Sequence, residues 1–164
     1  MFGKKEWFTL NIKEIIVTSD EQLEQCLAVR MEVFVKEQQV PRDLEVDELD
    51  ASWEACKHFL LLDDSKPVAA GRYRLYDEQT AKLQRIAVLS TYRGHGLGRQ
   101  LIELMEKEIS EHNISAIILD AQLSAETFYR KLGYVTESEE TFLDAGILHV
   151  RMKKMRDASG KGRF

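Results

Sequence analysis

The feature that most constrains this chain is a glycine-rich segment, Arg93-Gly-His-Gly-Leu-Gly98, placed between two regular elements. Apolar alternation over 80–89 predicts a strand before it, and apolar residues at helical spacing over 97–112 predict a helix after it. Glycine permits positive φ and close approach of the backbone to a ligand. The first turn of a helix offers unpaired N–H groups and the positive end of the helix dipole. This order therefore predicts a site for phosphate or pyrophosphate, to which Arg93 and Arg99 add charge.

Two other phosphate motifs do not fit the segment. The dinucleotide fingerprint GxGxxG needs glycine where Arg99 stands, and no Gly-Lys-Ser/Thr follows, as a P-loop requires. A glycine-rich turn without a ligand is the structural alternative.

The rest of the pattern predicts a mixed α+β sheet. A helix is expected over 20–36, because Ser19 and Gln22 have capping-box spacing and apolar residues follow at helical intervals. A further short helix is expected from residue 125. Besides 80–89, strands are expected over 12–17, 58–63, 68–76, 115–121, 134–137 and 147–152. Hairpins come first and a βαβ unit follows, which does not match an alternating Rossmann order.

The strand over 80–89 has a break in its alternation. Apolar residues stand at Ala81 and Leu83, then at Ile86 and Val88, so the parity shifts by one across Gln84-Arg85. A β-bulge produces such a shift. Burial of both strand faces near its end is the alternative.

Composition excludes several classes of protein. The 164 residues carry a formal net charge of −5, which lacks the basic excess of a general nucleic-acid binder. Cys26 and Cys56 form no metal-ligand pattern, so no metal is expected. No apolar run is long enough for a membrane span, and the N-terminus lacks the apolar run of a signal peptide. We therefore expect a cytoplasmic protein with neither a membrane nor a nucleic acid as partner.

Two motifs resemble those of the GNAT N-acetyltransferase superfamily. The segment Ile86-Ala-Val-Leu-Ser-Thr-Tyr-Arg-Gly-His-Gly-Leu-Gly-Arg-Gln-Leu101 is similar to the acetyl-CoA motif Arg/Gln-x-x-Gly-x-Gly/Ala of that superfamily. Ala125-Glu-Thr-Phe-Tyr-Arg-Lys-Leu-Gly-Tyr134 is similar to its second signature, Ala-x-x-Phe-Tyr-x-x-x-Gly-Phe/Tyr. Segments at 30–41, 120–122 and 144–149 are similar to the ElaA/YjcF-like branch, which says little about the acceptor.

The resemblance implies a fold and an activity. The fold would be the GNAT fold, a mixed central sheet of about six to seven strands with flanking helices and a bulged fourth strand. One domain would span 12–154, between an N-terminal extension over 1–11 and a flexible tail over 155–164. The activity would be direct acetyl transfer from acetyl-CoA, without metal, to a small-molecule or peptide amine, by a monomer or homodimer. An acyl-CoA-binding sensor without turnover is the alternative.

The resemblance also assigns roles to residues. Tyr129 would be the general acid that protonates the departing thiolate, although it could instead be a packing aromatic. The superfamily fixes no position for the general base. From the residues themselves, His149 is a candidate, because histidine suits proton transfer near neutral pH, ahead of His58, Glu48 and Asp47. The residues expected at the cofactor are Ile86, Ala87, Val88, Arg93, Gly94, His95, Gly96, Leu97, Gly98, Arg99 and Phe128.

The acceptor side is suggested by an acidic connection, residues 37–54, which contains seven acids and one base. In the GNAT fold this connection forms one wall of the acceptor cleft. We expect it to attract a cationic acceptor, with a solvated acidic loop as the alternative. Arg30 could instead recognise a carboxylate or phosphate on the acceptor, and Arg72 and Arg74 could line the cleft or lie on an open face.

Overall fold

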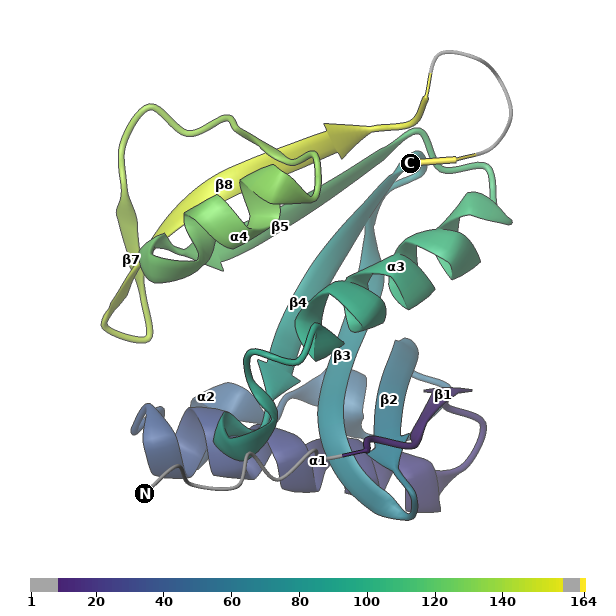
Figure 1. The fold of residues 1–164 in the computed structure, drawn as a ribbon. Helices are drawn as coiled ribbons and strands as arrows, with labels where there is room; N and C mark the ends of the chain where they lie inside the picture. The colour runs from purple at the N-terminus through teal and green to yellow at the C-terminus, as the bar shows by residue number, and fades with distance from the viewer. Residues whose placement is uncertain (1–8, 158–162) are drawn as a thin grey trace, which may run out of the picture.

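The computed structural model describes residues 9–157 and 163–164. The elements follow the predicted order (Figure 1). The strands are β1 (Ile12–Ile16), β2 (Lys57–Asp63), β3 (Lys66–Asp77), β4 (Thr80–Val88), β5 (Ala116–Gln122), β6 (Val135–Thr136), β7 (Phe142–Asp144) and β8 (Ile147–Met155). The α-helices are α1 (Asp20–Arg30), α2 (Arg42–Glu45), α3 (Leu97–Ser110) and α4 (Glu126–Lys131). Shorter turns are the π-helix η1 (Met31–Glu37) and the 3-10 helices η2 (Glu48–Asp50), η3 (Ser90–Tyr92) and η4 (Leu123–Ala125).

The described strands form one mixed sheet, which confirms the predicted α+β class. Its order is β1-β2-β3-β4-β5-β8-β6, with β7 also paired to β8. Of these pairs, β4 and β5 run parallel and the others antiparallel. The sheet has eight strands, one more than the sequence predicts. The additional strand is β7, whose three residues are too few to show a period-2 pattern.

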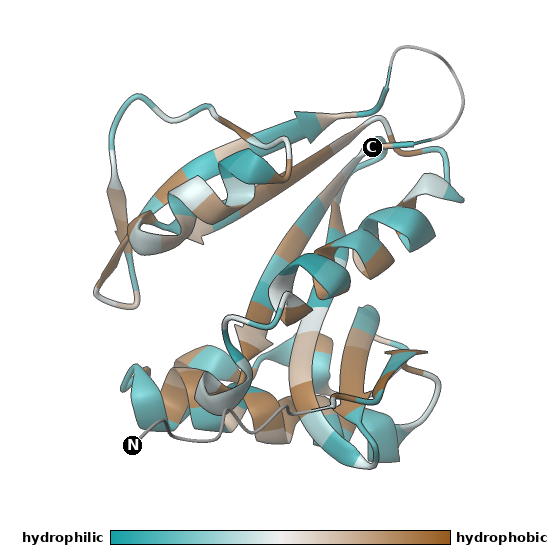
Figure 2. Ribbon diagram, viewed as in Figure 1, coloured by the Kyte–Doolittle hydropathy of each residue, from teal (hydrophilic) through white to brown (hydrophobic). Residues whose placement is uncertain are grey.

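Helices cover both faces of the sheet. Apolar side chains of α3, including Leu101, Met105 and Ile109, pack with Tyr129 of α4 on one face and are buried. Leu23, Cys26 and Val29 of α1 are buried against the other face. Figure 2 shows the apolar residues concentrated on the strands and on the helix surfaces turned toward them. Ser19 caps α1 by accepting the amide of Gln22 at 3.2 Å, as predicted.

The predicted bulge in β4 is confirmed. The register with β3 moves from Ala70↔Ala87 to Arg72↔Gln84, so β4 has one residue more than its partner. Arg85 sits at the bulge with φ of 58°. Gly71 lies opposite, where a Cβ atom would come within 2.9 Å of the Ile86 side chain. Glycine at 71 therefore provides the space into which the bulged strand folds.

The parallel pairing of β4 and β5 ends early and determines where the site lies. Its last pair is Leu83↔Leu119, and beyond it the two strands separate into a V (Figure 1). Residues 84–88 consequently have no partner on β5. The backbone edge of β4 is thus open on that side.

The ends of the predicted domain are only partly described. Residues 1–8 and 158–162, which make up much of the expected extension and tail, lie outside the described residues. Strand β8 continues to Met155, and Phe164 packs against the core. The boundaries at 12 and 154 stay a prediction.

Candidate active site

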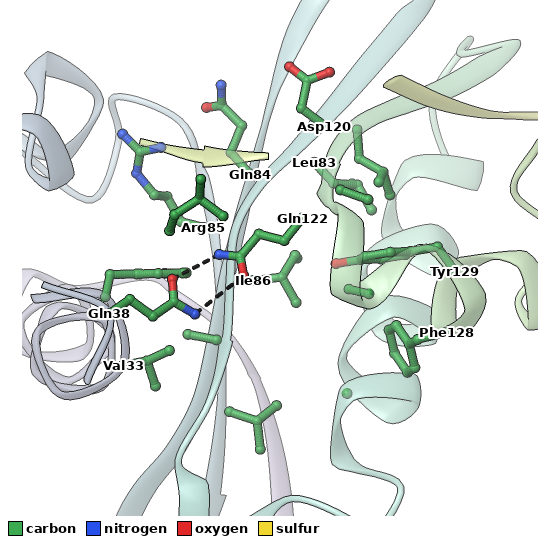
Figure 3. A pocket seen from close by; sticks show the side chains of 18 of the residues that line it. Val33, Gln38, Leu83, Gln84, Arg85, Ile86, Asp120, Gln122, Phe128 and Tyr129 are labelled. Atoms are coloured by element: carbon green, nitrogen blue, oxygen red, sulfur yellow. Dashed lines mark hydrogen bonds between the residues drawn. The ribbon is translucent and has the colours of Figure 1, made fainter. Parts of the chain in front are cut away.

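A cavity of about 790 Å³ lies where β4 and β5 separate. Its walls come from the bulged part of β4, the glycine turn, the end of β5 with α4, and η1 with α2 (Figure 3). Predicted cofactor residues in the lining are Ile86, Ala87, Val88, Arg93, Gly94, Gly96, Leu97, Gly98, Arg99 and Phe128. His95 is exposed and is not among the lining residues, so the structure places it outside the cavity wall.

The glycine turn has the local geometry that its sequence predicts. Gly94 and Gly96 have φ of 81° and 78°, and a Cβ atom on either would meet nothing within 4 Å. Gly98 is needed for a different reason, because a Cβ atom there would lie 3.1 Å from the Phe128 ring. No described residue accepts a hydrogen bond from the backbone N–H groups of residues 94–99. Open space and free donors beside a cavity fit a pyrophosphate group.

The two arginines of the turn differ in their contacts. Arg93 donates two hydrogen bonds to Glu37, at 2.6 and 2.8 Å, and a third to the Val88 carbonyl at 3.1 Å. The hydrogen bonds from Arg93 lower the pKa of Glu37. Arg99 pairs with Glu103 on the exposed side of α3. Arg93 therefore links η1 to the turn at the cavity wall, while the ion pair of Arg99 lies within its own helix.

Tyr129, the candidate general acid, lies in the cavity wall. Its ring is edge-on to Phe128 at 5.0 Å and to Tyr134 at 5.9 Å between ring centroids. Figure 3 shows its hydroxyl directed into the cavity. Burial raises the pKa of Tyr129. The phenol thus stays protonated at neutral pH and can donate its proton inside the cavity.

Of the two candidate histidine bases, only His149 lines the cavity. Its Nδ1 donates to the Ile147 carbonyl at 2.7 Å, and its ring stacks on Phe142. This bond leaves Nε2 as the proton-accepting nitrogen of the neutral ring. His58 is 1% exposed and donates from Nε2 to the Leu49 carbonyl at 3.1 Å. Burial lowers the pKa of His58, which is a structural residue outside the cavity lining.

The acidic connection is folded into a network of ion pairs. Arg30, 1% exposed, bonds Glu45 at 2.9 Å and Asp50 at 2.7 Å. Arg72, also 1% exposed, bonds Asp50 at 2.9 Å and Asp47 at 2.7 Å. Burial by itself would raise the pKa of Asp50, but the hydrogen bonds and charge of Arg30 hold it well below its usual range. The expectation that Arg30 recognises the acceptor is therefore wrong, because its guanidinium is enclosed and fully engaged.

Arg85 completes this network at the bulge of β4. Its guanidinium lies 3.4 Å from Glu45 and 3.6 Å from Asp47, and it donates to the carbonyls of Leu44 and Glu45. Three arginines thus balance three of the carboxylates from which a cationic acceptor was expected. The two other candidate bases, Glu48 and Asp47, both lie outside the cavity lining, and Glu48 is exposed. Glu45, Asp47 and Asp50 are therefore not a free anionic wall. Other acids of the connection, Asp43, Glu48 and Glu54, are exposed, and a cationic acceptor stays a prediction.

Sequence reasoning missed an amide pair that spans the cavity. Gln122 of β5 donates to Gln38 at 2.8 Å, and the reciprocal contact is 3.5 Å (Figure 3). The two residues are 84 positions apart, so no local pattern links them. The sequence signal was that both residues lie in segments, 30–41 and 120–122, that are similar to the ElaA/YjcF-like branch.

Neither a metal site nor a membrane helix is found in the part of the chain that the structure describes. No group of three or more His, Cys, Asp or Glu residues there could hold a metal ion. No helix among those residues is long and apolar enough to cross a membrane.

Comparisons with known proteins agree with this geometry. Residues 16–156 match the family model of the acetyltransferase (GNAT) domain. The chain is 45% identical over 143 residues to the uncharacterized N-acetyltransferase YjcF of Bacillus subtilis strain 168, covering 87% of this chain and 99% of YjcF. The fold is similar to Escherichia coli ElaA, with a TM-score of 0.76, 25% identity, and coverage of 88% and 99%. It is also similar to an acyl-CoA N-acyltransferase from Pseudomonas aeruginosa, with a TM-score of 0.75, 27% identity, and coverage of 89% and 99%.

Proposed function

The chain belongs to the GNAT acetyltransferase family, and from this premise we propose that it transfers an acetyl group from acetyl-CoA directly to the primary amine of a small molecule or peptide. The observation that carries the proposal is the cavity between β4 and β5, which has free backbone amides at one end and the Tyr129 hydroxyl in its wall. A cavity of about 790 Å³ is in the range of pockets that enclose small molecules.

The donor would be held mainly by backbone groups. The amides of residues 94–99 would bind the pyrophosphate, because they point from a helix N-terminus and lack partners among the described residues. The open backbone edge of residues 86–88 would hold the pantetheine arm and the thioester. Phe128, packed against Gly98, would support the arm.

The chemistry would need three proton transfers. Acetyl-CoA supplies a thioester, at which the C–N bond to the amine forms as the C–S bond breaks. Tyr129 would give its phenolic proton to the leaving sulfur, and its phenolate would recover the second proton that the nitrogen loses as the amide forms. The acceptor enters as an ammonium ion and must lose a proton before it can attack. His149 Nε2 would take that proton, directly or through water.

Replacing the phenol tests the role of Tyr129. In a thiol-release assay with acetyl-CoA and a panel of amines, we expect Tyr129→Phe to lower kcat by about 10²–10⁴-fold, as is typical for loss of a general acid. Tyr134→Phe is the matched control, because its ring packs against Tyr129 but does not line the cavity.

Each outcome of this assay has a definite reading. An unchanged kcat for Tyr129→Phe would remove the residue as the acid. Binding of acetyl-CoA without release of CoA by any amine would support the sensor alternative. Absence of any coenzyme A binding to the wild-type protein would refute both.

A further inference from the structure

The β7–β8 hairpin adds one face of side chains to the cavity wall. The pairs Phe142↔His149 and Asp144↔Ile147 place four side chains on one face, because opposite residues of an antiparallel pair share a face. Gln122, the last residue of β5, pairs with His149, so the turn of the hairpin extends beyond β5 (Figure 1). Of this face, Asp144, Ile147 and His149 line the cavity. Asp144 and His149 are diagonal neighbours across the two strands, at a typical separation of about 7–8 Å.

Asp144 is the carboxylate of the cavity lining that has no partner among the described residues. None of them donates a hydrogen bond to it or forms an ion pair with it, although an aspartate beside a turn commonly accepts a backbone N–H. The other charged side chains of the lining are all paired, at 3.1, 3.4, 2.6 and 2.8 Å, as Lys82–Asp120, Arg85–Glu45, Arg93–Glu37 and Arg99–Glu103. The exposed carboxylate of Asp144 is therefore available to a ligand in the cavity.

One further cation, Arg151, lies on the same face of β8 but outside the cavity lining. It shares Asp120 with Lys82, and its guanidinium lies 5.5 Å from the centre of the Tyr76 ring. Arg151 is four residues along β8 from Ile147, the partner of Asp144, which corresponds to about 13 Å. Its charge is therefore remote from Asp144 and does not neutralise that carboxylate.

We propose that the acceptor is a diamine, whose second ammonium group binds Asp144 while the attacking amine lies at His149. The inference rests on the proposed acetyl transfer and names its substrate class. An ammonium group would give Asp144 the charged hydrogen-bond donor that it lacks. The separation of about 7–8 Å between Asp144 and His149 lets one short, linear molecule reach both. The charge that selects a cationic acceptor would thus lie on the hairpin and not on the acidic connection.

Three matched series of acceptors test the proposal by thiol release with acetyl-CoA. They are linear diamines of increasing chain length, alkylamines of equal length, and ω-amino acids of equal length, which place a cation, a methyl group or an anion at the far end. We expect the highest kcat/KM among the diamines, at least about tenfold above the alkylamine of the same length, which corresponds to about 1.4 kcal/mol. The difference should lie in KM more than in kcat, because the ion pair forms in the ground state as well as in the transition state.

Three variants separate recognition from structure. Asp144→Asn should lower kcat/KM about tenfold for the diamines and leave the alkylamines at wild-type values. Asp144→Glu keeps the charge and extends it by one methylene, so it should retain the preference for diamines and favour a shorter one. Asp43→Asn, the same change at an exposed position of the acidic connection outside the cavity lining, should keep wild-type values. A merely structural role for Asp144 would reduce activity toward all three series alike.

The failures of the two proposals are distinguishable. Alkylamines or amino acids that equal the diamines, or an equal loss of the diamine preference in Asp43→Asn and Asp144→Asn, would leave acetyl transfer intact and overturn the assignment of Asp144. Acetyl-CoA binding without transfer to any of the three series would overturn amine acetylation, and this inference with it.

Discussion

The glycine turn (residues 93–99) and the acidic connection (residues 37–54) border the same cavity but are built on opposite principles. The turn acts through its own backbone: positive φ at Gly94 and Gly96, and amides without partners among the described residues. The acidic connection acts through side chains whose partners come from α1, β3 and β4. A sequence motif therefore predicts function more reliably when the function depends on the backbone of the motif than when it depends on side chains whose partners lie elsewhere in the chain.

The same difference applies to the charge of the acidic connection. Charge counted along a segment becomes surface charge only if the side chains reach solvent. Glu45 and Asp50 are 3% and 7% exposed, because they form ion pairs with buried arginines, Glu45 with Arg30 and Asp50 with both Arg30 and Arg72. Three of the seven acids in the segment are thus paired with arginines from other elements, so their charge does not act at the surface as the sequence count suggests.

The largest expected effect comes from breaking this network. Arg30→Met leaves Glu45 and Asp50 buried with one cation fewer, which should lower the free energy of unfolding by about 3–5 kcal/mol. Arg99→Met is the matched control. Its ion pair to Glu103, 2.8 Å long, is similar in length but exposed, so its loss should cost less than about 0.5 kcal/mol. Urea unfolding measures both.

Equal, small losses in the two variants would contradict the contrast between buried and exposed pairs. If Arg30→Met does not accumulate as folded protein, Asp50→Asn provides a second measurement. It removes one charge of the same network and should also destabilise the protein by more than the Arg99 control.

A smaller effect is expected from breaking the turn. Gly96→Ala puts an L side chain at φ of 78°, which costs about 1–2 kcal/mol, and reorients amides proposed to bind the pyrophosphate. Affinity for coenzyme A, measured by calorimetry, should fall about tenfold. Gly146→Ala is matched in φ, 77°, and in open surroundings, but lies in the β7–β8 turn. It should lose similar stability and keep its affinity; equal losses of affinity would contradict a role for the turn.

The sequence predicted those parts of the fold that depend on local pattern. The parity shift at Gln84-Arg85 located the bulge, because alternation in a strand is local. The same pattern could not show that Gly71, on the neighbouring strand, provides the space for it. The contacts of Gln38 with Gln122, and of Arg93 with Glu37, also join distant segments. Such pairs follow from tertiary packing, which a single sequence does not reveal.

The smallest expected effect is on the pH dependence of stability and involves His58. This residue anchors the acidic connection by its hydrogen bond to the Leu49 carbonyl. Burial lowers the pKa of His58 in the folded chain. As the pH falls below about 6.5, the pKa of histidine in the unfolded chain, His58 is protonated in the unfolded chain but stays neutral in the folded chain. Stability from this group is therefore full above that pH and declines below it, by at most about 1.4 kcal/mol per pH unit.

The measurement is the difference in free energy of unfolding between about pH 7.5 and about pH 5.5, a window that spans the unfolded pKa of histidine. His58→Gln should remove part of the loss seen in the wild type. His95→Gln takes an exposed imidazole from the glycine turn and should leave the pH dependence as it was. If the two variants show the same dependence as the wild type, His58 titrates normally, and the acidic connection is anchored by its arginines alone.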